Sequence, residues 1–500
     1  MTPSSTVYDH FNLLGKFTVA PVADFADPTM YPGACFGRID YDEREAIRAL
    51  SGDFCYTKTT RKHLDVSVRK MDKPVRRNYL GCELYPQALE IVKEMFEVGL
   101  TQPHMTPDEI LSDLDLTKAP GFFETWRGFR SKKDCVIAGV LNEYANQDLT
   151  EIPIWKVSGK NEIKETSAYV NEYKQRTFII EPFNLLWHDK RIFGHQNSGL
   201  KQMWWSAYGF NPYDGGTGNL WQTLSVFKRF WEWDVKGYDR VMPHLDDISA
   251  IRSAFVVPDK FLDWVVKNKI HSHCVLPNGD FIYKTWGNNS GSGTTTTDNI
   301  IGMAIIIVHG FLRVGVSRKD ILSKVHCLIF GDDVLGGDNL PFSDDEMREI
   351  FTNTFALYGY ELDPLIVTHD LEGMSFLGFE LVKVGSHVLP KYKLPRLAFS
   401  FSHVVSDKED IDVELSKMMS IMLMSVGHGP DIYNLFRKSL KQAVVRSSSS
   451  IAIRLMKNGL DANIPTYQDA LSWCIGMEGF DSEDKILWLE VVQNFIVCDE

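Results

Sequence analysis

One stretch, "CLIFGDDVLGGDN" from Cys327 to Asn339, constrains the fold of this chain more than any other. Leu328 to Phe330 are apolar and indicate a buried strand, and after a single glycine the chain places Asp332 and Asp333 side by side. Adjacent carboxylates repel each other, and a carboxylate near a core is costly unless it is paired or bound to a metal. We therefore expect a strand–turn–strand unit whose tip holds both aspartates beside a compensating positive charge.

A second acidic strand end precedes this unit in "FWEWDVKGYD", where Asp234 follows an aromatic-rich strand and Asp239 comes five residues later. The segment "GNNSGSGTTTTDN" stands between the two strand ends. If the two strands are neighbours in one sheet, Asp234 joins Asp332 and Asp333. Magnesium prefers oxygen ligands and shares them with phosphates, and two such ions can activate a hydroxyl and stabilise a leaving oxygen at phosphorus. The sequence therefore predicts a site for two divalent cations.

Composition limits the class of protein. The 500 residues are 44% hydrophobic, which is enough for the cores of more than one domain. A formal charge of -13 argues against a protein that coats nucleic acid with its whole surface, but it allows a basic channel inside an acidic shell.

No signal peptide is visible at the N-terminus, and the most apolar run, Ile300 to Val308, is shorter than the roughly 20 residues of a membrane span. We expect a buried helix there and no transmembrane segment.

The eight cysteines are scattered without a CxxC pair, which predicts reduced thiols and neither a disulfide framework nor a zinc ribbon. "HSHC", His271 to Cys274, is the only tight cluster of potential metal ligands. It stands between a helix-like run and the turn Pro277 to Gly279, so we favour a plain loop over a metal site.

The texture of the sequence changes along the chain. Residues 1 to about 210 are irregular and carry basic clusters, of which Arg61 to Arg77 and Lys118 to Lys133 could line a path for a nucleic-acid template or could be solvated loops. Residues 226 to 383 alternate strand-like and helix-like runs, the pattern of a sheet backed by helices. After Pro395 a helical period dominates, which predicts a separate helical subdomain.

Seven segments, in order, resemble the motifs of RNA-dependent RNA polymerases of positive-strand RNA viruses. They are "TKAPGF" (117–122, motif G), "GKNEIKETSAYVNEYKQRTF" (159–178, motif F), "DVKGYD" (234–239, motif A), "SGSGTTTTDN" (290–299, motif B), "FGDD" (330–333, motif C), "ALYGYELDP" (356–364, motif D) and "FLGFELV" (376–382, motif E). Within this group of the picornavirus supergroup, "GFNPYDGG" before motif A and "FLGF" in motif E are most similar to the astrovirus-like branch.

The resemblance implies an α+β right-hand polymerase. Its fingers would be residues 1–225 and 247–285, its palm, an antiparallel sheet backed by helices, residues 226–246 and 286–383, and its helical thumb residues 384–500. Such an enzyme replicates and transcribes a viral genome by adding nucleoside triphosphates to an RNA 3′-hydroxyl on a single-stranded RNA template. Implied partners are template and nascent RNA, other viral replication proteins and, if the astrovirus resemblance holds, a genome-linked protein primer. The implied location is the host cytoplasm, at membrane-associated replication complexes reached through other proteins.

The resemblance also implies roles for single residues. Mg²⁺, which Mn²⁺ can replace, would be bound by Asp234 and Asp332, with Asp333 as an auxiliary ligand. Asp239 and Asn299 are spaced like the pair that senses the ribose; alternatively, Asn299 only stabilises its helix. Threonines 294 to 297 would open that helix and cap its free amides. The other residues expected to contact the nucleotide are Lys160, Lys164, Lys174, Arg176, Ser290, Gly291 and Thr295.

One motif departs from the family pattern. Many relatives carry a lysine shortly after the glycine of motif D, as a proposed general acid for pyrophosphate release, but here no lysine follows Gly359 until Lys383. His369 is the nearest candidate donor, with an ordinary loop histidine as the alternative. Two other functions stay open: a reverse transcriptase, which normally has an aromatic residue where Asp239 stands, and a non-catalytic RNA-binding scaffold on a degenerate palm.

Overall fold

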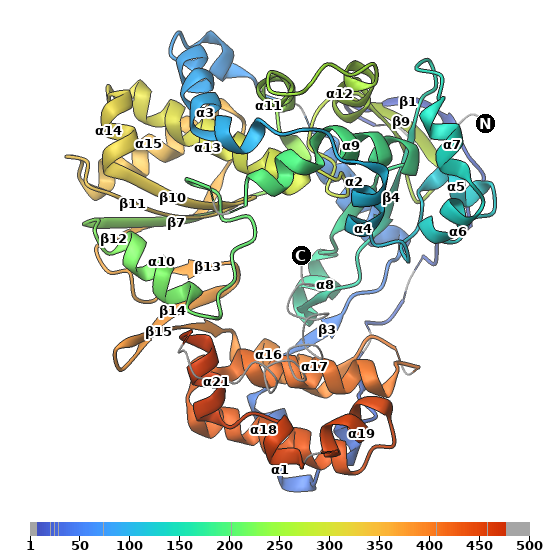
Figure 1. Cartoon of the computed structure of the whole chain (residues 1–500), viewed down its shortest axis with the longest axis vertical. Coiled ribbons are helices and arrows are strands. Elements are labelled where there is room, and N and C mark those ends of the chain that lie inside the picture. Colours follow the sequence, from blue (N-terminus) through green and yellow to red (C-terminus); the bar gives the residue numbers. More distant parts are fainter. Residues whose placement is uncertain are drawn as a thin grey trace.

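The computed structural model describes residues 8–476 apart from 21, 25, 29, 74, 202, 407 and 458. Figure 1 shows an upper body that mixes sheets and helices and a lower body made mainly of helices. The expected α+β class is therefore confirmed.

A four-stranded antiparallel sheet lies in the upper body, with the order β10-β11-β7-β12. Its strands are β10 (Val325–Phe330), β11 (Asp333–Asp338), β7 (Arg229–Val235) and β12 (Leu362–Thr368). Side chains alternate between the two faces of a strand, and Trp231 and Trp233 of β7 stack on each other with ring centroids 4.9 Å apart. Both rings pack on Phe351 of a covering helix. Asp234 consequently points to the opposite face.

Helices cover the Trp231 face of this sheet (Figure 1). They are α3 (Tyr85–Leu100), α11 (Leu245–Ser253), α13 (Thr295–Arg313) and α15 (Asp344–Leu357). The sheet backed by helices that the alternating pattern predicted is thus confirmed. Among the described residues, α13 alone has the length and hydropathy of a membrane span, and 89% of that window is buried inside the protein. The expectation of a buried helix at Ile300 to Val308 agrees with this position.

A five-stranded sheet joins distant parts of the chain, with the order β1-β9-β8-β4-β6. Its strands are β1 (Asn12–Lys16), β9 (Asp280–Lys284), β8 (Ser272–Val275), β4 (Ile154–Gly159) and β6 (Thr177–Ile180). Helices α9 (Phe183–Gly199) and α12 (Leu262–Ile270) pack against it. The "HSHC" block is therefore mostly a strand, and the expectation of a plain loop is wrong. Ser272 and Cys274 lie on the same face of β8 and are buried, because β8 pairs with β4 on one side and with β9 on the other.

The lower body is a helical bundle with its own core. It contains α16 (Leu394–Ser402), α17 (Ile411–Met424), α18 (Pro430–Val445), α19 (Ser450–Met456) and α21 (Tyr467–Cys474). The predicted helices from Ile411 and from Asp431 correspond to α17 and α18. The N-terminal helix α1 (Tyr41–Leu50) packs against α16 and α18, which the sequence pattern did not indicate.

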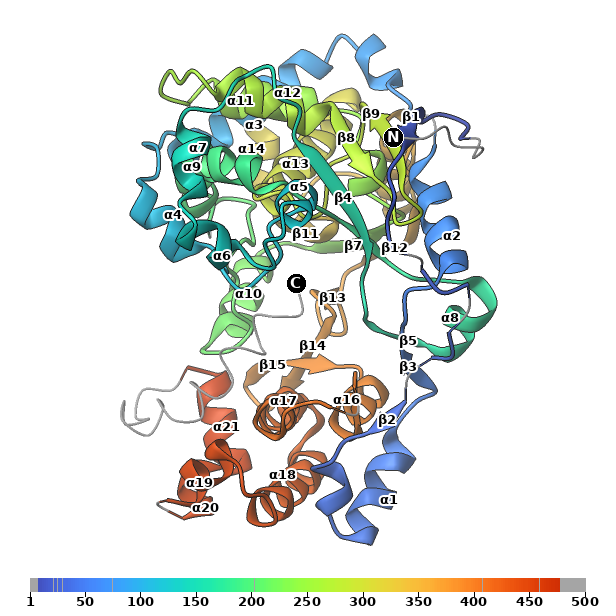
Figure 2. The same cartoon turned by 90° about the vertical axis from the view of Figure 1, so that its right-hand side faces the viewer.

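Short strands connect the two bodies (Figure 2). The hairpin expected at 376–382 is present as β13 (Ser375–Phe376) and β14 (Phe379–Val384), which pairs further with β15 (His387–Tyr392). On the other side, β2 (Tyr31–Pro32) pairs with β16 (His403–Val404), and β3 (Phe54–Tyr56) pairs with β5 (Ile163–Glu165). The remaining α-helices are α2 (Arg61–Met71), α4 (Pro107–Asp113), α5 (Phe122–Trp126), α6 (Lys132–Ile137), α7 (Val140–Ala145), α8 (Thr166–Glu172), α10 (Gly216–Leu224), α14 (Arg318–Lys324) and α20 (Leu460–Asn463).

The contact between β7 and β11 leaves no room for a side chain at Gly336, because an added Cβ would overlap the ring of Trp231. We expect Gly336→Ala to destabilise the protein by about 1–3 kcal/mol, the usual cost of overpacking. The measurement is thermal unfolding followed by circular dichroism. Gly218→Ala is the matched control, because this glycine lies in α10 with no atom near its Cβ position, and it should leave the melting temperature unchanged or raise it. Equal melting temperatures for Gly336→Ala and the wild type would contradict the packing described for β7 and β11.

Candidate active site

The pairing of β7 with β11 places the predicted carboxylates together. Val334 lies opposite Trp233, and in an antiparallel pair the next residues outward, Asp333 and Asp234, also face each other, with Cα atoms about 4.5–5.5 Å apart. Asp332 belongs to the tight turn between β10 and β11, where Gly331 adopts a φ of 67° that a glycine tolerates well. Three carboxylates therefore lie near one another at one end of the sheet, as the two strand ends predicted.

The charge of this cluster is only partly compensated by the protein. Asp332 is half-buried, and desolvation, followed by the charges of Asp239 and Asp333, raises its pKa to about 7. Asp333 is open to solvent, but the protein mass around it reduces its hydration, and this effect together with the charge of Asp234 raises its pKa to about 6. Arg176 lowers both pKa values, but less than these causes raise them.

This surplus of negative charge fits a divalent cation. Across the part of the chain that the structure describes, no three His, Cys, Asp or Glu side chains converge closely enough to form a complete metal cage. Such a cage is not required for Mg²⁺, which keeps several waters and is usually held by one or two carboxylates together with substrate phosphates. Asp234, Asp332 and Asp333 are therefore suited to an ion whose coordination is completed by a phosphorylated substrate.

The glycine-rich segment before α13 lies against β6. The Oγ of Ser290 accepts a hydrogen bond from the backbone N–H of Ile179 at 3.3 Å, and Gly291 forms an isolated β-bridge with Ile180. A Cβ at position 291 would overlap the carbonyl oxygen of Ile179. The glycine at this position is thus explained by a close approach between two backbones.

The hydroxyls of the threonine run act differently from the prediction. No side chain caps the start of α13 at Thr294, so the expectation that threonines 294 to 297 cap free amides is wrong. Thr294 donates to Asp298 at 2.7 Å, Thr295 to the carbonyl of Asn289 at 2.6 Å, and Thr297 to Asn197 at 2.7 Å. Thr295 and Thr297 thus attach the helix start to neighbouring segments, whereas Thr294 bonds an aspartate one turn further along α13.

Asn299 and Asp239 both lie beside the turn that carries Asp332. The Nδ2 of Asn299 is 4.0 Å from the Cβ position of Gly331, and the charge of Asp239 acts on Asp332. The side-chain oxygen of Asn299 accepts a hydrogen bond from Asn288 at 2.9 Å. Asn288 is a residue that the sequence reasoning missed, although the asparagine doublet in "GNNSGSG" was a visible signal.

The four basic residues expected at the nucleotide are placed differently from one another. Arg176 is exposed, and its charge reaches Asp332 and Asp333. Lys164 lies 3.4 Å from a carboxylate oxygen of Glu162, Lys174 lies 2.8 Å from one of Glu172, and Lys160 is half-buried with its backbone N–H bonded to the carbonyl of Arg176. Arg176 is therefore the member of this group that the structure brings to the carboxylates.

His369 lies at the opposite end of the sheet. Leu362 of β12 is paired with Val235, whereas Thr368 is paired with Phe230, so about 13 Å of strand separates this end from Asp234. The Nδ1 of His369 is 2.7 Å from the carbonyl oxygen of Lys228, and its Nε2 is 3.2 Å from Asp344. This position corrects the expectation that His369 donates a proton at the carboxylates: the antiparallel register carries it away from them.

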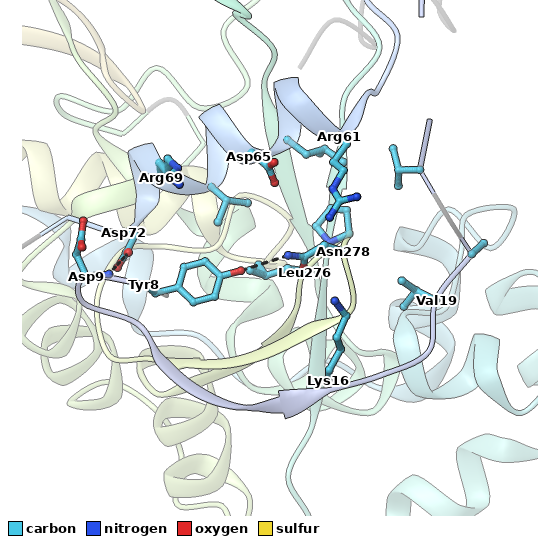
Figure 3. A pocket seen from close by; sticks show the side chains of 15 residues that line it. Tyr8, Asp9, Lys16, Val19, Arg61, Asp65, Arg69, Asp72, Leu276 and Asn278 are labelled. Atoms are coloured by element: carbon cyan, nitrogen blue, oxygen red, sulfur yellow. Dashed lines mark hydrogen bonds between the residues drawn. The ribbon is translucent and has the colours of Figure 1, made fainter. Parts of the chain in front are cut away.

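Part of the basic cluster from Arg61 to Arg77 surrounds a pocket of about 440 Å³ (Figure 3). Arg61 and Arg69 of α2 line it together with Asp65, and the hydroxyl of Tyr8 donates to Asp280 at 2.7 Å beside it. Basic and acidic side chains thus alternate around the pocket, and the structure does not form a continuous basic groove there.

Comparison with known proteins adds a family match. A family model described as viral RNA-dependent RNA polymerase matches residues 120–444. The genome polyprotein of zucchini yellow mosaic virus (strain Reunion Island) is 24% identical over 376 residues, which cover 70% of this chain and 12% of that polyprotein. The genome polyprotein of plum pox potyvirus (strain SK 68) is 21% identical, with 71% of this chain and 12% of the polyprotein covered. Non-structural polyprotein 1AB of human astrovirus-4 is 29% identical over 201 residues, 37% of this chain and 14% of the polyprotein. The chain thus spans about one eighth of the length of these relatives.

The raised pKa of Asp332 generates a stability prediction. The folded state disfavours the ionised form of Asp332, so ionisation lowers the stability of the protein. This loss of stability is fully present above about pH 7, and it disappears as the pH falls through about 7 toward the pKa of an aspartate in the unfolded chain, near 4. In EDTA, Asp332→Asn should therefore melt above the wild type at pH 8, and the difference should vanish near pH 4. Mg²⁺ should raise the melting temperature of the wild type more than that of the variant.

The control for this experiment is Asp345→Asn, because the side chain of Asp345 is 95% exposed and an exposed charge contributes little. This variant should follow the wild type at every pH. If Asp332→Asn melts at or below the wild type in EDTA at pH 8, the carboxylates do not repel one another as described.

Proposed function

The chain belongs to the family of viral RNA-dependent RNA polymerases, and we propose that it extends an RNA 3′-hydroxyl with nucleoside triphosphates on a single-stranded RNA template. The observation that carries this proposal is the β7–β11 register, which sets Asp234 opposite Asp333 beside Asp332. Phosphoryl transfer depends mainly on positioning and on neutralising charge, and the carboxylates together with Arg176 are arranged for both.

The chemistry assigns a role to each part of the cluster. Asp234 and Asp332, with Asp333 as auxiliary ligand, would hold Mg²⁺, which Mn²⁺ can replace. When bound, two such ions favour ionisation of the attacking hydroxyl and stabilise the leaving oxygen. Arg176 would grip the triphosphate, because a guanidinium binds phosphate in a bidentate manner. The other residues proposed to contact the nucleotide are Lys160, Lys164, Lys174, Asp239, Ser290, Gly291, Thr295 and Asn299.

The architecture supports a right-hand arrangement. In this proposal residues 226–246 and 286–383 form the palm, since they contain the four-stranded sheet. Residues 1–225 and 247–285 would be the fingers, and residues 384–500 the thumb. The packing of α1 on α16 and α18 favours one refinement, in which the segment around α1 belongs to the thumb side of the hand.

The partners and the place of action are part of the same proposal. A polymerase of this class would bind template and nascent RNA and work with other viral replication proteins on membrane-associated complexes of the host cytoplasm. A genome-linked protein as primer, which the astrovirus-like resemblance of the sequence implies, is part of this proposal. Against a reverse transcriptase, the position of Asp239 beside Asp332 provides a polar neighbour for a ribose hydroxyl. Against a non-catalytic scaffold, the carboxylate cluster is intact.

The direct test is incorporation of a labelled nucleotide on a homopolymer RNA template with Mg²⁺ or Mn²⁺. We expect Asp234→Ala and Asp332→Ala each to lower the rate about a thousandfold or more, because a metal-organised transition state loses roughly 4–5 kcal/mol of stabilisation. Asp345→Ala, which changes an exposed carboxylate, should retain wild-type activity. A folded Asp332→Ala protein that keeps one tenth of the wild-type rate would refute the assignment.

Choice of sugar gives a second test. A polar site that bonds the 2′-hydroxyl penalises the deoxynucleotide, because its own groups are then left unpaired. One such bond, at about 1.5–3 kcal/mol, corresponds to roughly ten- to a hundredfold discrimination. Asn299→Ala should therefore lower the ratio of ribonucleotide to 2′-deoxynucleotide incorporation by this factor.

Asn288→Ala is the companion variant, because it removes the hydrogen bond that orients Asn299 together with the bond from Asn288 to the carbonyl of Thr295, and it should lower the same ratio by a smaller factor. An active Asn299→Ala protein with the wild-type ratio would show that this residue does not sense the sugar.

A further inference from the structure

The glycine-rich loop from Ser290 to Thr294 is attached to one strand and its continuation at three successive points. Two of them are the contacts of Ser290 with Ile179 and of Gly291 with Ile180. At the third, the backbone N–H of Gly293 donates to the Oε2 of Glu181 at 2.8 Å. Glu181 directly follows β6 and is the only side chain among these strand-side partners.

The segment from Arg176 to Phe183 contacts other parts of the site as well. It begins at Arg176, whose charge reaches Asp332 and Asp333. At its other end the backbone N–H of Phe183 donates to the carbonyl of Pro120 at 3.1 Å. One short segment thus connects the cation at the carboxylates, the glycine-rich loop and the loop at Pro120.

Glu181 belongs to a buried cluster that contains one carboxyl group more than it contains cations. Three carboxylates, Glu181, Asp189 and Asp298, are each no more than 2% exposed, and they face two buried cations. Lys269 lies 3.2 Å from both aspartates, and Arg252 lies 2.6 Å from Asp298. Both cations therefore lie against the aspartates, and the Oε1 of Glu181, like both side-chain oxygens of Asp189, is buried without a hydrogen-bond partner.

A buried carboxylate without an ion-pair partner is expensive, because it loses its hydration and gains no opposite charge in return. Burial and the neighbouring Asp189 raise the pKa of Glu181 well above its usual range, whereas Lys269, the N–H of Gly293 and Lys190 lower it. Stability therefore does not explain why a glutamate stands here, whereas the bond to Gly293 does.

We propose that Glu181 is a positioning residue for nucleotide addition, which locks the loop from Ser290 to Thr294 onto the strand that follows Arg176. This inference rests on the proposed polymerase function. With the bond in place, the loop beside the nucleotide and the cation that faces its phosphates keep one geometry. Without the bond, the N–H of Gly293 is left unpaired and the loop leaves β6 more often. Part of the binding free energy of each nucleotide is then spent on ordering the loop.

Two variants separate this role from a merely structural one. Glu181→Met fills the same volume but offers no acceptor to Gly293. Glu181→Gln keeps an acceptor oxygen for the N–H of Gly293 in a side chain of nearly the same size. The control is Glu414→Met in the lower body, since Glu414 is also a buried glutamate that accepts backbone N–H groups, from Cys35 at 2.9 Å and Phe36 at 3.2 Å.

Two measurements test the proposal: hydrogen exchange of the amides in residues 287–294, and KM and kcat for a nucleoside triphosphate on a primed template. We expect Glu181→Met to speed exchange in this loop and to raise KM roughly tenfold, with a smaller change in kcat, because the hydrogen bond to the N–H of Gly293 is lost and that donor stays unpaired. Its melting temperature should not fall. Glu181→Gln should restore both values, and Glu414→Met should leave exchange in the loop unchanged.

Wild-type exchange and wild-type KM in Glu181→Met would overturn the proposal, and so would a Glu181→Gln protein as impaired as Glu181→Met. A wild-type chain that incorporates no nucleotide would instead contradict the proposed polymerase function. The exchange of residues 287–294 would still report in that case whether Glu181 holds the loop.

Discussion

The antiparallel pairing of β7 with β11 is the constraint on which the rest of the site depends. It sets Asp234 opposite Asp333, one residue beyond the pair formed by Trp233 and Val334. A shift of one residue would turn Asp234 toward the helices and the tryptophans toward the opposite face of the sheet. The stacked Trp231 and Trp233 against Phe351 therefore maintain the register, and packing on one face of the sheet determines the chemistry on the other.

Two kinds of buried charge serve this site in different ways. The carboxylates at the sheet end repel one another, and the positive charge of Arg176 compensates their negative charge only in part. Behind the glycine-rich loop, in contrast, Lys269 and Arg252 neutralise two aspartates, and only Glu181 is left over. Its one hydrogen bond goes to the loop. In both places a carboxyl group that the surrounding protein does not fully satisfy lies where the proposed reaction needs an interaction.

Local signals in the sequence predicted much of this arrangement. The strands at Asp234 and Asp332 and the helix after Thr294 follow from periodicity and turn residues, so their juxtaposition could be expected. The failures have a common cause in tertiary contacts. "HSHC" is mostly a strand because β4 and β9 flank it. The register of β12 places His369 at the end of the sheet away from the carboxylates. Helix α1 packs on helices that are far along the chain. Glu181 gained its role from Gly293, a partner that is remote in sequence.

The most direct measurement of the central claim is the binding of Mn²⁺, followed by electron paramagnetic resonance, in the presence of primed RNA and a non-hydrolysable nucleoside triphosphate. If Asp234, Asp332 and Asp333 form the proposed cation site, the wild type should bind about two ions per active site, and Asp234→Asn and Asp332→Asn should each weaken this binding at least tenfold while RNA binding persists. Equal Mn²⁺ binding by the wild type and both variants would contradict the account.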